Sequence, residues 1–535
     1  MAALMQEQTV LADGRVELRP DVDAALGISN LHNEDLAPVP IAKRTWTTYN
    51  YVALWIGMAH NIPTWGLAAS LVLLGMAWYQ AILTIMIANI VVLAPMLLNS
   101  HAGTKYGIPY PVFARASFGV FGANLPALIR AGVACGWFGI QTWIGGTAIF
   151  TIMGAIIGKD SWWMTAGKIP IGLGDYAWQP WTLWLSFFVF WALNILIIVR
   201  GMNAVRKFEN WAAPFVLIVA VFLLIWMTIQ AGGFGPLLED HGTVGWSLDK
   251  FWFGIFPPSL MAMIAFWSTL SLNMPDFTRF GRSQREQAIG QALGLPTTMT
   301  IFPLIAVLVT SAATVVYKGE DVNNLFNPVF LVAKFDNVFV VILGLIALGV
   351  ATLSVNVAAN IVSPSYDFSN AWPKRISFRT GGLITGVVGI LIQPWNLYND
   401  PNSYIFTWLG TYGGATGAIA GVLIADYWWI RRTHLKLADL YRADGIYRYL
   451  RGWNWIAVVS LLVGILFAIG GSWSGVDAAG KHLGPYPVDG IIPILKPLAD
   501  WSWVVGGVVS FFLYGILTKL VPTTSTTAEA AASAA

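Results

Sequence analysis

Four long apolar runs in this sequence carry polar side chains, and the first of them holds a histidine and an asparagine just before a proline. His60, Asn61 and Pro63 lie inside an apolar run from about residue 51 to residue 78. Proline has no N–H for the helical ladder and its ring clashes with the carbonyl one turn earlier, so we expect a broken helix. Polar groups in a run that crosses a membrane need protein or water as partners. The break is therefore either a buried binding site or a proline kink bonded to neighbouring helices.

A tryptophan and a glutamine share one face of the third apolar run, at about residues 124–157. Trp137 and Gln141 are four positions apart, which places them on the same side of a helix. An indole can stack on a flat ring, and a carboxamide can both donate and accept hydrogen bonds at the edge of that ring. The pair suits a planar heterocycle. The alternative is a glutamine bonded to a neighbouring helix.

The sixth apolar run resembles the first. Trp267 precedes an Asn-x-Pro-Asp sequence that begins at Asn273 and ends at Asp276, and this predicts a second irregular helix. The Asn-x-Pro echoes the one at Asn61. Runs one and six would be corresponding members of two five-helix halves, where transporters commonly place discontinuous helices.

Two asparagines lie on one face of the eighth run. Asn356 and Asn360 are four positions apart, and two carboxamides at this depth exceed what helix packing normally requires. We expect them to face the interior of a helix bundle. Asp426, near the end of the tenth run, is expected to be the partner of a nearby arginine.

The composition indicates that membrane-spanning helices position these residues. The chain has 535 residues, 56% hydrophobic and 11% charged, with a mean hydropathy of +0.64, which is typical of an all-α polytopic membrane protein. The net charge of +3 does not indicate nucleic-acid binding, because the basic residues flank the apolar runs. Cys135 is the only cysteine, so the sequence excludes an intrachain disulfide. Twelve spans are predicted, at about residues 50–76, 79–98, 124–157, 182–199, 211–231, 252–274, 292–316, 337–362, 381–395, 404–430, 454–471 and 500–520.

The basic residues are distributed unevenly between the two sides of these spans. Alternating the connections places 22 of the 30 Lys and Arg residues on one side, together with both termini. The positive-inside rule makes that side cytoplasmic, in a cell membrane. The predicted segments are a cytoplasmic N-terminal segment (1–46), a transporter core of ten spans (47–430), a cytoplasmic loop (431–453), two further spans (454–520) and a disordered tail (521–535).

The sequence holds no motif that indicates an enzyme or an ATP-driven pump. It contains no HExxH zinc motif, no GxxxxGK[ST] phosphate loop, and no Cys or His cluster. We therefore expect no catalytic residues and no cofactor, and we expect the energy for transport to come from an ion gradient. The expected partners are a small heterocyclic substrate, a coupling cation and the lipid bilayer.

Four stretches of the chain resemble the first nucleobase–cation symporter family, whose members are permeases for uracil, purines, cytosine, allantoin and hydantoins. They begin at Asn33 (NEDLAPVP), Gly136 (GWFGIQTW), Leu272 (LNMPDFTRF) and Ser354 (SVNVAANIVSP). The resemblance implies an inverted-repeat fold of the leucine-transporter type. Spans 1–5 and 6–10 would be the repeats, with two extra C-terminal helices outside them.

The resemblance also implies a substrate site. Trp137 and Trp267 would sandwich a planar ring, with Phe266 beside them, while Gln141 and Asn360 would bond to its edge. The Asn61 side chain in the broken helix would add a polar contact.

A sodium site implied by the resemblance departs from the family pattern in this chain. Its ligands would be the carbonyls of Gly57, His60 and Ala351 and the hydroxyl of Ser354, but Val355 occupies the position of a second hydroxyl. A hard cation that lacks one oxygen ligand binds less well. The coupling ion is therefore either Na⁺, weakly bound, or H⁺. His60 is the histidine placed to carry a proton, unless it is neutral and bonded to a nearby carbonyl.

Together these observations predict a permease that imports a nucleobase or a related planar cyclic ureide by alternating access. Uracil is the favoured substrate, and allantoin or a hydantoin is the alternative. A channel or an amino-acid carrier is less favoured, because the expected pocket is aromatic and holds no basic residue for a carboxylate.

Overall fold

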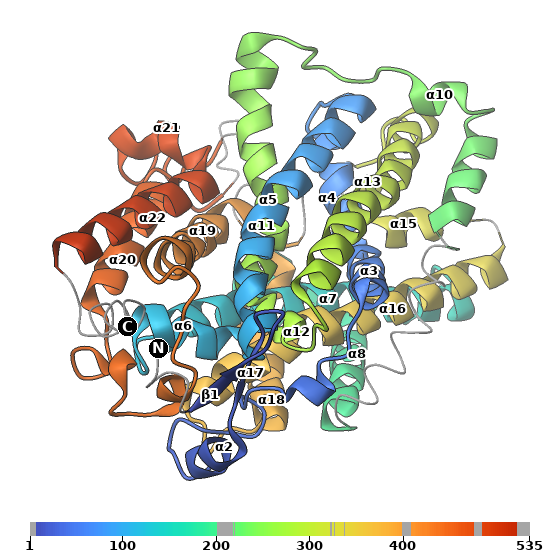
Figure 1. Cartoon of the computed structure of the whole chain (residues 1–535). Coiled ribbons are helices and arrows are strands. Elements are labelled where there is room, and N and C mark those ends of the chain that lie inside the picture. Colours follow the sequence, from blue (N-terminus) through green and yellow to red (C-terminus); the bar gives the residue numbers. More distant parts are fainter. Residues whose placement is uncertain are drawn as a thin grey trace.

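The computed structural model of this chain is built mainly from helices (Figure 1). It describes residues 7–521 apart from 201–217, 219, 322–323, 326, 336, 399–407 and 476–483. Parts of the predicted fifth and tenth spans therefore lie outside the described residues, as does the predicted tail beyond Val521.

Twelve apolar helical segments follow one another through the described residues, in agreement with the sequence. Seven helices are long and apolar enough by themselves to cross a membrane, and shorter or interrupted helices form the others. In chain order the segments are α3 (Thr48–Ala59) with α4 (Ile62–Leu73), α5 (Trp78–Tyr106), α7 (Asn124–Ile157), α8 (Trp181–Arg200), a helix at Ala220–Gln230, η3 (Leu248–Ile255) with α11 (Phe256–Asn273), α13 (Gln284–Val316), α16 (Val338–Asn360), α18 (Phe378–Leu391), α19 (Gly410–Ile424) with η6 (Ala425–Ile430), α20 (Trp455–Ile469) and α22 (Ser502–Leu520).

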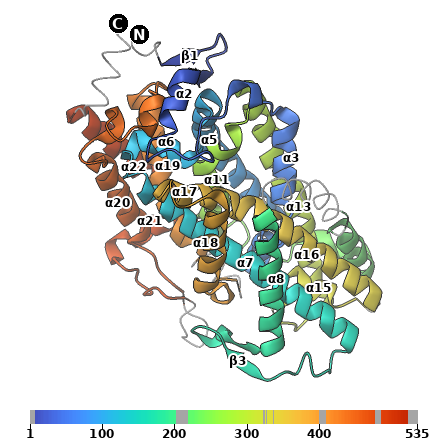
Figure 2. The ribbon, with the colours of Figure 1, turned by 90° about the horizontal axis from the view of Figure 1, so that it is seen from below.

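Shorter elements connect these segments. Two antiparallel hairpins pair β1 (Gln8–Val10) with β2 (Val16–Leu18) and β3 (Lys168–Pro170) with β4 (Trp178–Pro180), and Figure 2 shows β1 and β3 at opposite ends of the molecule. The remaining helices are α2 (Pro20–Leu26), η1 (Ile41–Lys43), α6 (Tyr110–Phe118), η2 (Asp175–Ala177), α10 (Gly235–Leu238), α12 (Pro275–Thr278), α15 (Pro328–Val332), α17 (Val362–Ala371), η4 (Pro394–Asn396), η7 (Ala438–Tyr441), η8 (Ile446–Arg448), η9 (Pro493–Leu495) and α21 (Lys496–Ala499).

The long helices pack in three groups. The broken helix α3–α4 packs with α5 and α13, and α11 packs against α5. A second group forms around α7, which contacts α8, α16, α17 and α18. The last helices, α19, α20 and α22, pack together at the left of Figure 1, and α19 joins them to α11. The first and second groups meet where α3 contacts α16 and α11 contacts α7.

The first span is broken where the sequence predicts it. Helix α3 ends at Ala59, and α4 begins at Ile62 with Pro63 in its first turn. Between them, His60 and Asn61 leave the helical region, with ψ angles of 76° and 164°. Proline fits the start of a helix because the first N–H groups have no intrahelical acceptor. The break is therefore a helix end followed by a new helix start.

The sixth span is also irregular, although its interruption is milder. It begins as a π-helix, η3, and α11 ends at Asn273 before the short helix α12 begins at Pro275. Met274 between them keeps helical dihedrals (φ −51°, ψ −28°). Pro275 removes one ladder hydrogen bond without forcing an extended residue, so the backbone stays helical here, unlike at Asn61.

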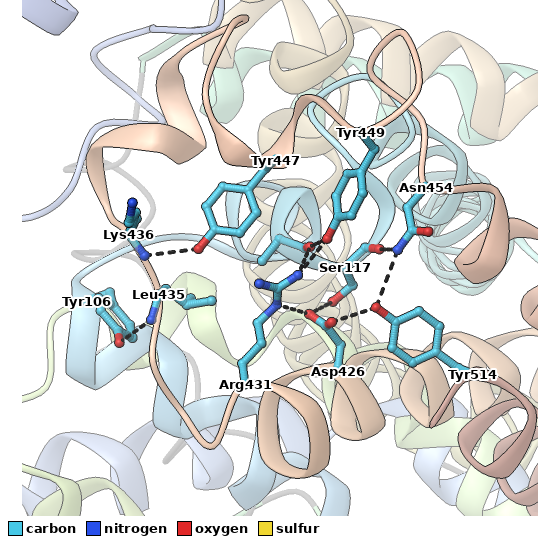
Figure 3. Close-up of polar contacts among 11 residues, drawn as sticks. Tyr106, Ser117, Asp426, Arg431, Leu435, Lys436, Tyr447, Tyr449, Asn454 and Tyr514 are labelled. Carbon is cyan, nitrogen blue, oxygen red and sulfur yellow. Dashed lines mark hydrogen bonds and ion pairs between the residues drawn. The ribbon is translucent and has the colours of Figure 1, made fainter. Parts of the chain in front are cut away.

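Asp426 pairs with an arginine, as predicted (Figure 3). Its Oδ2 accepts from Arg431 Nε at 2.7 Å and from Ser117 Oγ at 2.9 Å, and its Oδ1 accepts from Tyr514 OH at 2.6 Å. Arg431 also donates to the carbonyl of Ala116 at 2.9 Å. These contacts join η6 to α6 and α22, so the buried pair fastens the last helices to the core.

The N-terminal segment lies on the same face of the molecule as loop 431–453. Gln8 bonds to the backbone of Leu435 and Leu437, and Arg442 forms an ion pair at 2.8 Å with Glu7. Arg44 is buried and donates to backbone carbonyls, among them Val16 at 2.9 Å. Burial lowers the pKa of the Arg44 guanidinium to about 10. Both segments were expected on one side of the membrane, and the structure brings them together.

Candidate functional site

A chain of aromatic rings links the broken helix to α7 through α11. Trp55 on α3 meets Trp267 edge to face, with ring centroids 5.1 Å apart, and Trp267 meets Phe266 at 4.9 Å. Phe266 then meets Trp137 on α7 at 5.1 Å. All of these rings are buried. The three aromatic residues predicted for the substrate site are therefore neighbours, with Phe266 in contact with both tryptophans.

A tyrosine on α19 holds the Trp137 ring in place. The Trp137 indole N–H donates to Tyr412 OH at 3.1 Å, and that hydroxyl donates to the Ala265 carbonyl at 2.9 Å. Trp408 completes the group, with its ring 4.9 Å from Tyr412 and 6.1 Å from Trp137. Sequence reasoning missed Trp408 and Tyr412. Their four-residue spacing, the same as that of Trp137 and Gln141, is the signal that could have found them.

Two polar atoms of the predicted substrate residues are buried without a partner. Gln141 Oε1 and Trp267 Nε1 make no hydrogen bond within the part of the chain that the structure describes. Their side chains are almost inaccessible, with residue exposures of 4% for both. Buried polar atoms in proteins are nearly always paired. An unpaired acceptor and an unpaired donor in one aromatic region are suited to a ligand that carries both complementary groups.

The two asparagines of α16 differ in their surroundings. Asn356 Nδ2 contacts the Phe138 carbonyl, Thr142 Oγ1 and Asn194 Oδ1 at 3.1–3.2 Å, so it joins α16 to α7 and α8. Among the residues that the structure describes, Asn360 donates only to Asn356 Oδ1, at 3.0 Å. Asn356 therefore links helices, while Asn360 keeps its carbonyl oxygen outside that network.

Asn61 uses both of its polar atoms to bridge the helix break. Its Oδ1 accepts from the Thr64 N–H at 2.8 Å, and its Nδ2 donates to the Met58 carbonyl at 2.6 Å. In this structure Asn61 is an N-cap of α4, a role that asparagine fills well. A bond to substrate would require one of these two contacts to be exchanged.

His60 matches the reading of a histidine bonded to a nearby carbonyl. Its Nδ1 contacts the Ile56 carbonyl, and its ring packs edge-on against Phe302 with centroids 5.0 Å apart. The ring is buried. The side chain is therefore occupied within α3 and against α13.

The break frees the backbone carbonyls that the resemblance assigns to sodium. In a regular helix Gly57 would accept from the N–H of Asn61, and His60 from the N–H of Thr64. Here the Asn61 N–H donates to Ala59, and the Thr64 N–H donates to the Asn61 side chain. Both carbonyls thus lose their usual donors, which fits a cation site made of backbone oxygens.

The remaining predicted cation residues lie on α16, which packs against α3. Ala351, Ser354 and Val355 are all buried, and the Ser354 hydroxyl is the oxygen that this helix would add. Among the described residues no group of three or more His, Cys, Asp or Glu side chains could hold a metal ion. The residues present fit a sodium ion held mainly by backbone carbonyls, with one side-chain oxygen fewer than the family pattern has because of Val355.

Comparisons with known proteins identify the family. Residues 38–506 match the family model described as permease for cytosine/purines, uracil, thiamine, allantoin. The chain is 39% identical to the allantoin permease of Bacillus subtilis, over 94% of this chain and 96% of that protein. It is 37% identical to the purine-uracil permease of Arabidopsis thaliana, over 91% of this chain and 78% of that one.

A solved structure confirms the predicted fold. It is Mhp1, described as a nucleobase-cation-symport-1 family transporter in a closed conformation with bromovinylhydantoin bound. This chain matches it with a TM-score of 0.71 at 24% identity, covering 93% of this chain and 99% of that chain. The predicted polytopic helical fold of the inverted-repeat type is therefore correct. The chain is a membrane permease and belongs to the family of permeases for cytosine and purines, uracil, thiamine and allantoin.

Proposed function

We propose that this permease imports a nucleobase or a related planar cyclic ureide by cation-coupled alternating access across the cell membrane, with both termini in the cytoplasm. The observation that carries the proposal is the buried, unpaired acceptor of Gln141, which lies one helical turn after Trp137 on α7. Uncharged heterocycles of this class present N–H and C=O groups at the rim of a flat ring, so they can donate to this acceptor while stacking on an indole.

We propose the following roles for the individual residues of the site. Trp137 and Trp267 stack on the ring, and Phe266, which now lies between them, moves aside or packs on one edge. Gln141 and Asn360 bond to the rim of the substrate. Asn61 adds a contact when its bond to Met58 is exchanged. The Tyr412 hydroxyl keeps the indole of Trp137 oriented, because it is the acceptor of the indole N–H.

Uracil is the substrate that we favour, because its ring is wholly planar and suits an aromatic sandwich. Allantoin is the second candidate, and the 39% identity to an allantoin permease favours it. Its ring is of similar size but carries a flexible ureido group, which would need additional polar contacts.

Competition for uptake tests the proposal. Cells that express the chain are given labelled uracil together with an excess of unlabelled allantoin, hydantoin, cytosine, adenine or thiamine. Saturable and accumulating uptake, with the label recovered chemically unchanged, supports a transporter. Linear uptake without accumulation supports a channel, and a modified label supports an enzyme. The compound that competes best identifies the substrate.

Replacing Asn360 by alanine is expected to impair substrate binding more than replacing Asn356. Among the described residues, Asn360 makes one hydrogen bond and Asn356 makes four. Asn356→Ala should therefore lower stability instead, by about 1–3 kcal/mol for the unpaired groups left behind. Substrate affinity and thermal unfolding of the two purified variants separate these effects. Normal affinity in a folded Asn360→Ala variant would remove Asn360 from the site.

Uptake is expected to change little when sodium is replaced by choline and to fall when the pH gradient is collapsed. With Val355 the sodium site lacks one hydroxyl ligand, so sodium binds weakly. A weakly bound ion differs little in its affinity for the two transporter conformations, and it therefore contributes little driving force. Uptake with and without sodium, and with and without a protonophore, measures both contributions.

Restoring the hydroxyl should restore sodium dependence. Val355→Thr is expected to make uptake depend more strongly on sodium, while Val357→Thr, a buried position two residues along the same helix, is the matched control and should not. Wild-type uptake that requires sodium and ignores the protonophore would show that another oxygen completes the site.

A further inference from the structure

A second buried ion pair lies in the second group of helices, beside a carboxylate that belongs to the first group. Arg130 Nη1 on α7 lies 3.4 Å from Asp367 Oδ2 on α17, and the two side chains are 1% and 0% exposed. Asp276 on α12 is also buried, and it lies near enough to interact electrostatically with both residues. Two carboxylates and one guanidinium therefore share a region from which water is excluded.

The Arg130–Asp367 pair is incomplete, in contrast to the pair at Asp426. Both oxygens of Asp426 accept hydrogen bonds, and its arginine donates through Nε (Figure 3). Asp367 Oδ1 and Arg130 Nε have no partner within the described ranges. Two further buried atoms of the cluster, Asn273 Oδ1 and Tyr110 OH, are likewise unpaired there. A charged carboxylate with an unpaired oxygen is costly at this depth.

The two carboxylates are not equivalent. Asp276 Oδ1 accepts from the Tyr110 N–H, 2.8 Å away in the first turn of α6, and its Oδ2 lies 3.4 Å from Asn273 Nδ2. Donors at a helix N-terminus stabilise a negative charge. Within the described residues, Asp367 has a single long contact, to Arg130. The surroundings therefore favour the ionised form at Asp276 and the neutral form at Asp367.

The other charged groups near the cluster do not contact Asp367 in the described part of the chain. Arg115 on α6 donates to Asn370 Oδ1 on α17 and to the Leu440 carbonyl. The positive charge of Arg279 stabilises the ionised form of Asp276. Arg279, which follows α12, donates to the Asp35 carbonyl at 3.1 Å and lies over the rings of Phe280 and Tyr366. It forms no ion pair with Asp276 or Asp367 in the described part of the chain. The neutral groups that face the cluster are Tyr110 on α6, Cys135 on α7 and Tyr366 on α17.

We propose that Asp367 is a buried proton-binding site, in which a proton on this carboxyl leaves the charge of Arg130 balanced by Asp276. The step transfers one proton from a hydronium ion to a carboxylate oxygen: one O–H bond of hydronium breaks, one O–H bond forms on the carboxyl group, and a water molecule is released.

The location of the site connects it to transport. Asp276 follows α11, which packs against α5 in the first group of helices, whereas Arg130 and Asp367 belong to the second. A displacement of one group relative to the other separates Arg130 from Asp276. The Arg130 guanidinium would then pair with an ionised Asp367, so the Asp367 carboxyl would release its proton. Binding of the proton thus favours one arrangement of the two groups. This role in coupling rests on the proposed function, whereas occupancy by a proton does not.

Infrared spectroscopy of the purified full-length protein tests occupancy. We expect a carbonyl band of a protonated carboxyl group at neutral pH that is lost in Asp367→Asn, retained at a shifted position in Asp367→Glu and unaffected by Asp426→Asn. Because the Asn variant could fail to fold, the wild-type band is also followed as the pH is raised, where it should disappear. A band that is absent from the wild type, or that survives in folded Asp367→Asn, would overturn the proposal. Its removal by sodium at constant pH would assign the site to a metal cation instead.

Uptake tests the role in coupling. Wild-type uptake of labelled uracil or allantoin should rise as the external pH falls, and Asp367→Asn should lose this dependence. Asp160→Asn, an exposed carboxylate in the loop after α7, is the control and should keep it. An unchanged pH profile in Asp367→Asn would refute the coupling role. If the wild type transports no heterocycle, the proposed function fails, and the infrared band still decides whether the proton site exists.

Discussion

Replacing Trp137 or Gln141 by alanine is expected to abolish or strongly weaken uptake while leaving the protein inserted in the membrane. Trp137→Ala removes a stacking face and leaves Tyr412 OH without the indole donor. Gln141→Ala removes the buried acceptor that the protein itself leaves unpaired. A substrate group deprived of its buried partner costs about 1–3 kcal/mol, or about 5–150-fold in affinity. Binding of labelled substrate to purified protein measures the loss.

A tryptophan outside the aromatic group provides the matched control. Trp143 lies six residues further along α7 and packs against Trp184 and Trp395 instead. Trp143→Ala should lower the unfolding temperature through lost packing but preserve substrate affinity. Near wild-type affinity in both Trp137→Ala and Gln141→Ala would place the pocket elsewhere in the molecule.

Removing the arginine of the Asp426 pair is expected to cost the most stability of any single substitution considered for this chain. Arg431→Ala leaves the Asp426 carboxylate buried without a cation, and breaking a buried pair in this way costs about 3–5 kcal/mol. The purified variant should therefore unfold at a clearly lower temperature. The double variant Arg431→Ala/Asp426→Ala should recover part of the loss, because no uncompensated charge remains.

The exposed pair of Lys334 and Glu320 is the control for this comparison. Its charged atoms are as close, at 2.7 Å, but the side chains are 37% and 27% exposed. Water screens such a pair, so Lys334→Ala should cost no more than about 1 kcal/mol. Equal unfolding temperatures for Arg431→Ala and the wild type would show that the buried pair does not fasten the last helices.

The sequence by itself determined the elements of this protein and where the first of them breaks. The membrane spans can be predicted because a helix that crosses a bilayer requires about 20 consecutive apolar residues. The break at His60 and Asn61 is readable because Pro63 cannot continue a helix. Residues on one helix face, such as Trp137 and Gln141, are readable from the helical period. The family motifs then supplied the fold.

Only the tertiary structure decided which side chains on different helices meet. The spacing of Asn356 and Asn360 is symmetrical, yet one joins three helices and the other does not, because only Asn356 faces α7 and α8. Tyr412 could not be assigned to Trp137, since they are 275 residues apart and no sequence period links them. The incomplete pairing of Asp367 is decided in the same way. Hydrogen bonds act over about 3 Å, so partners across helices depend on how the helices pack.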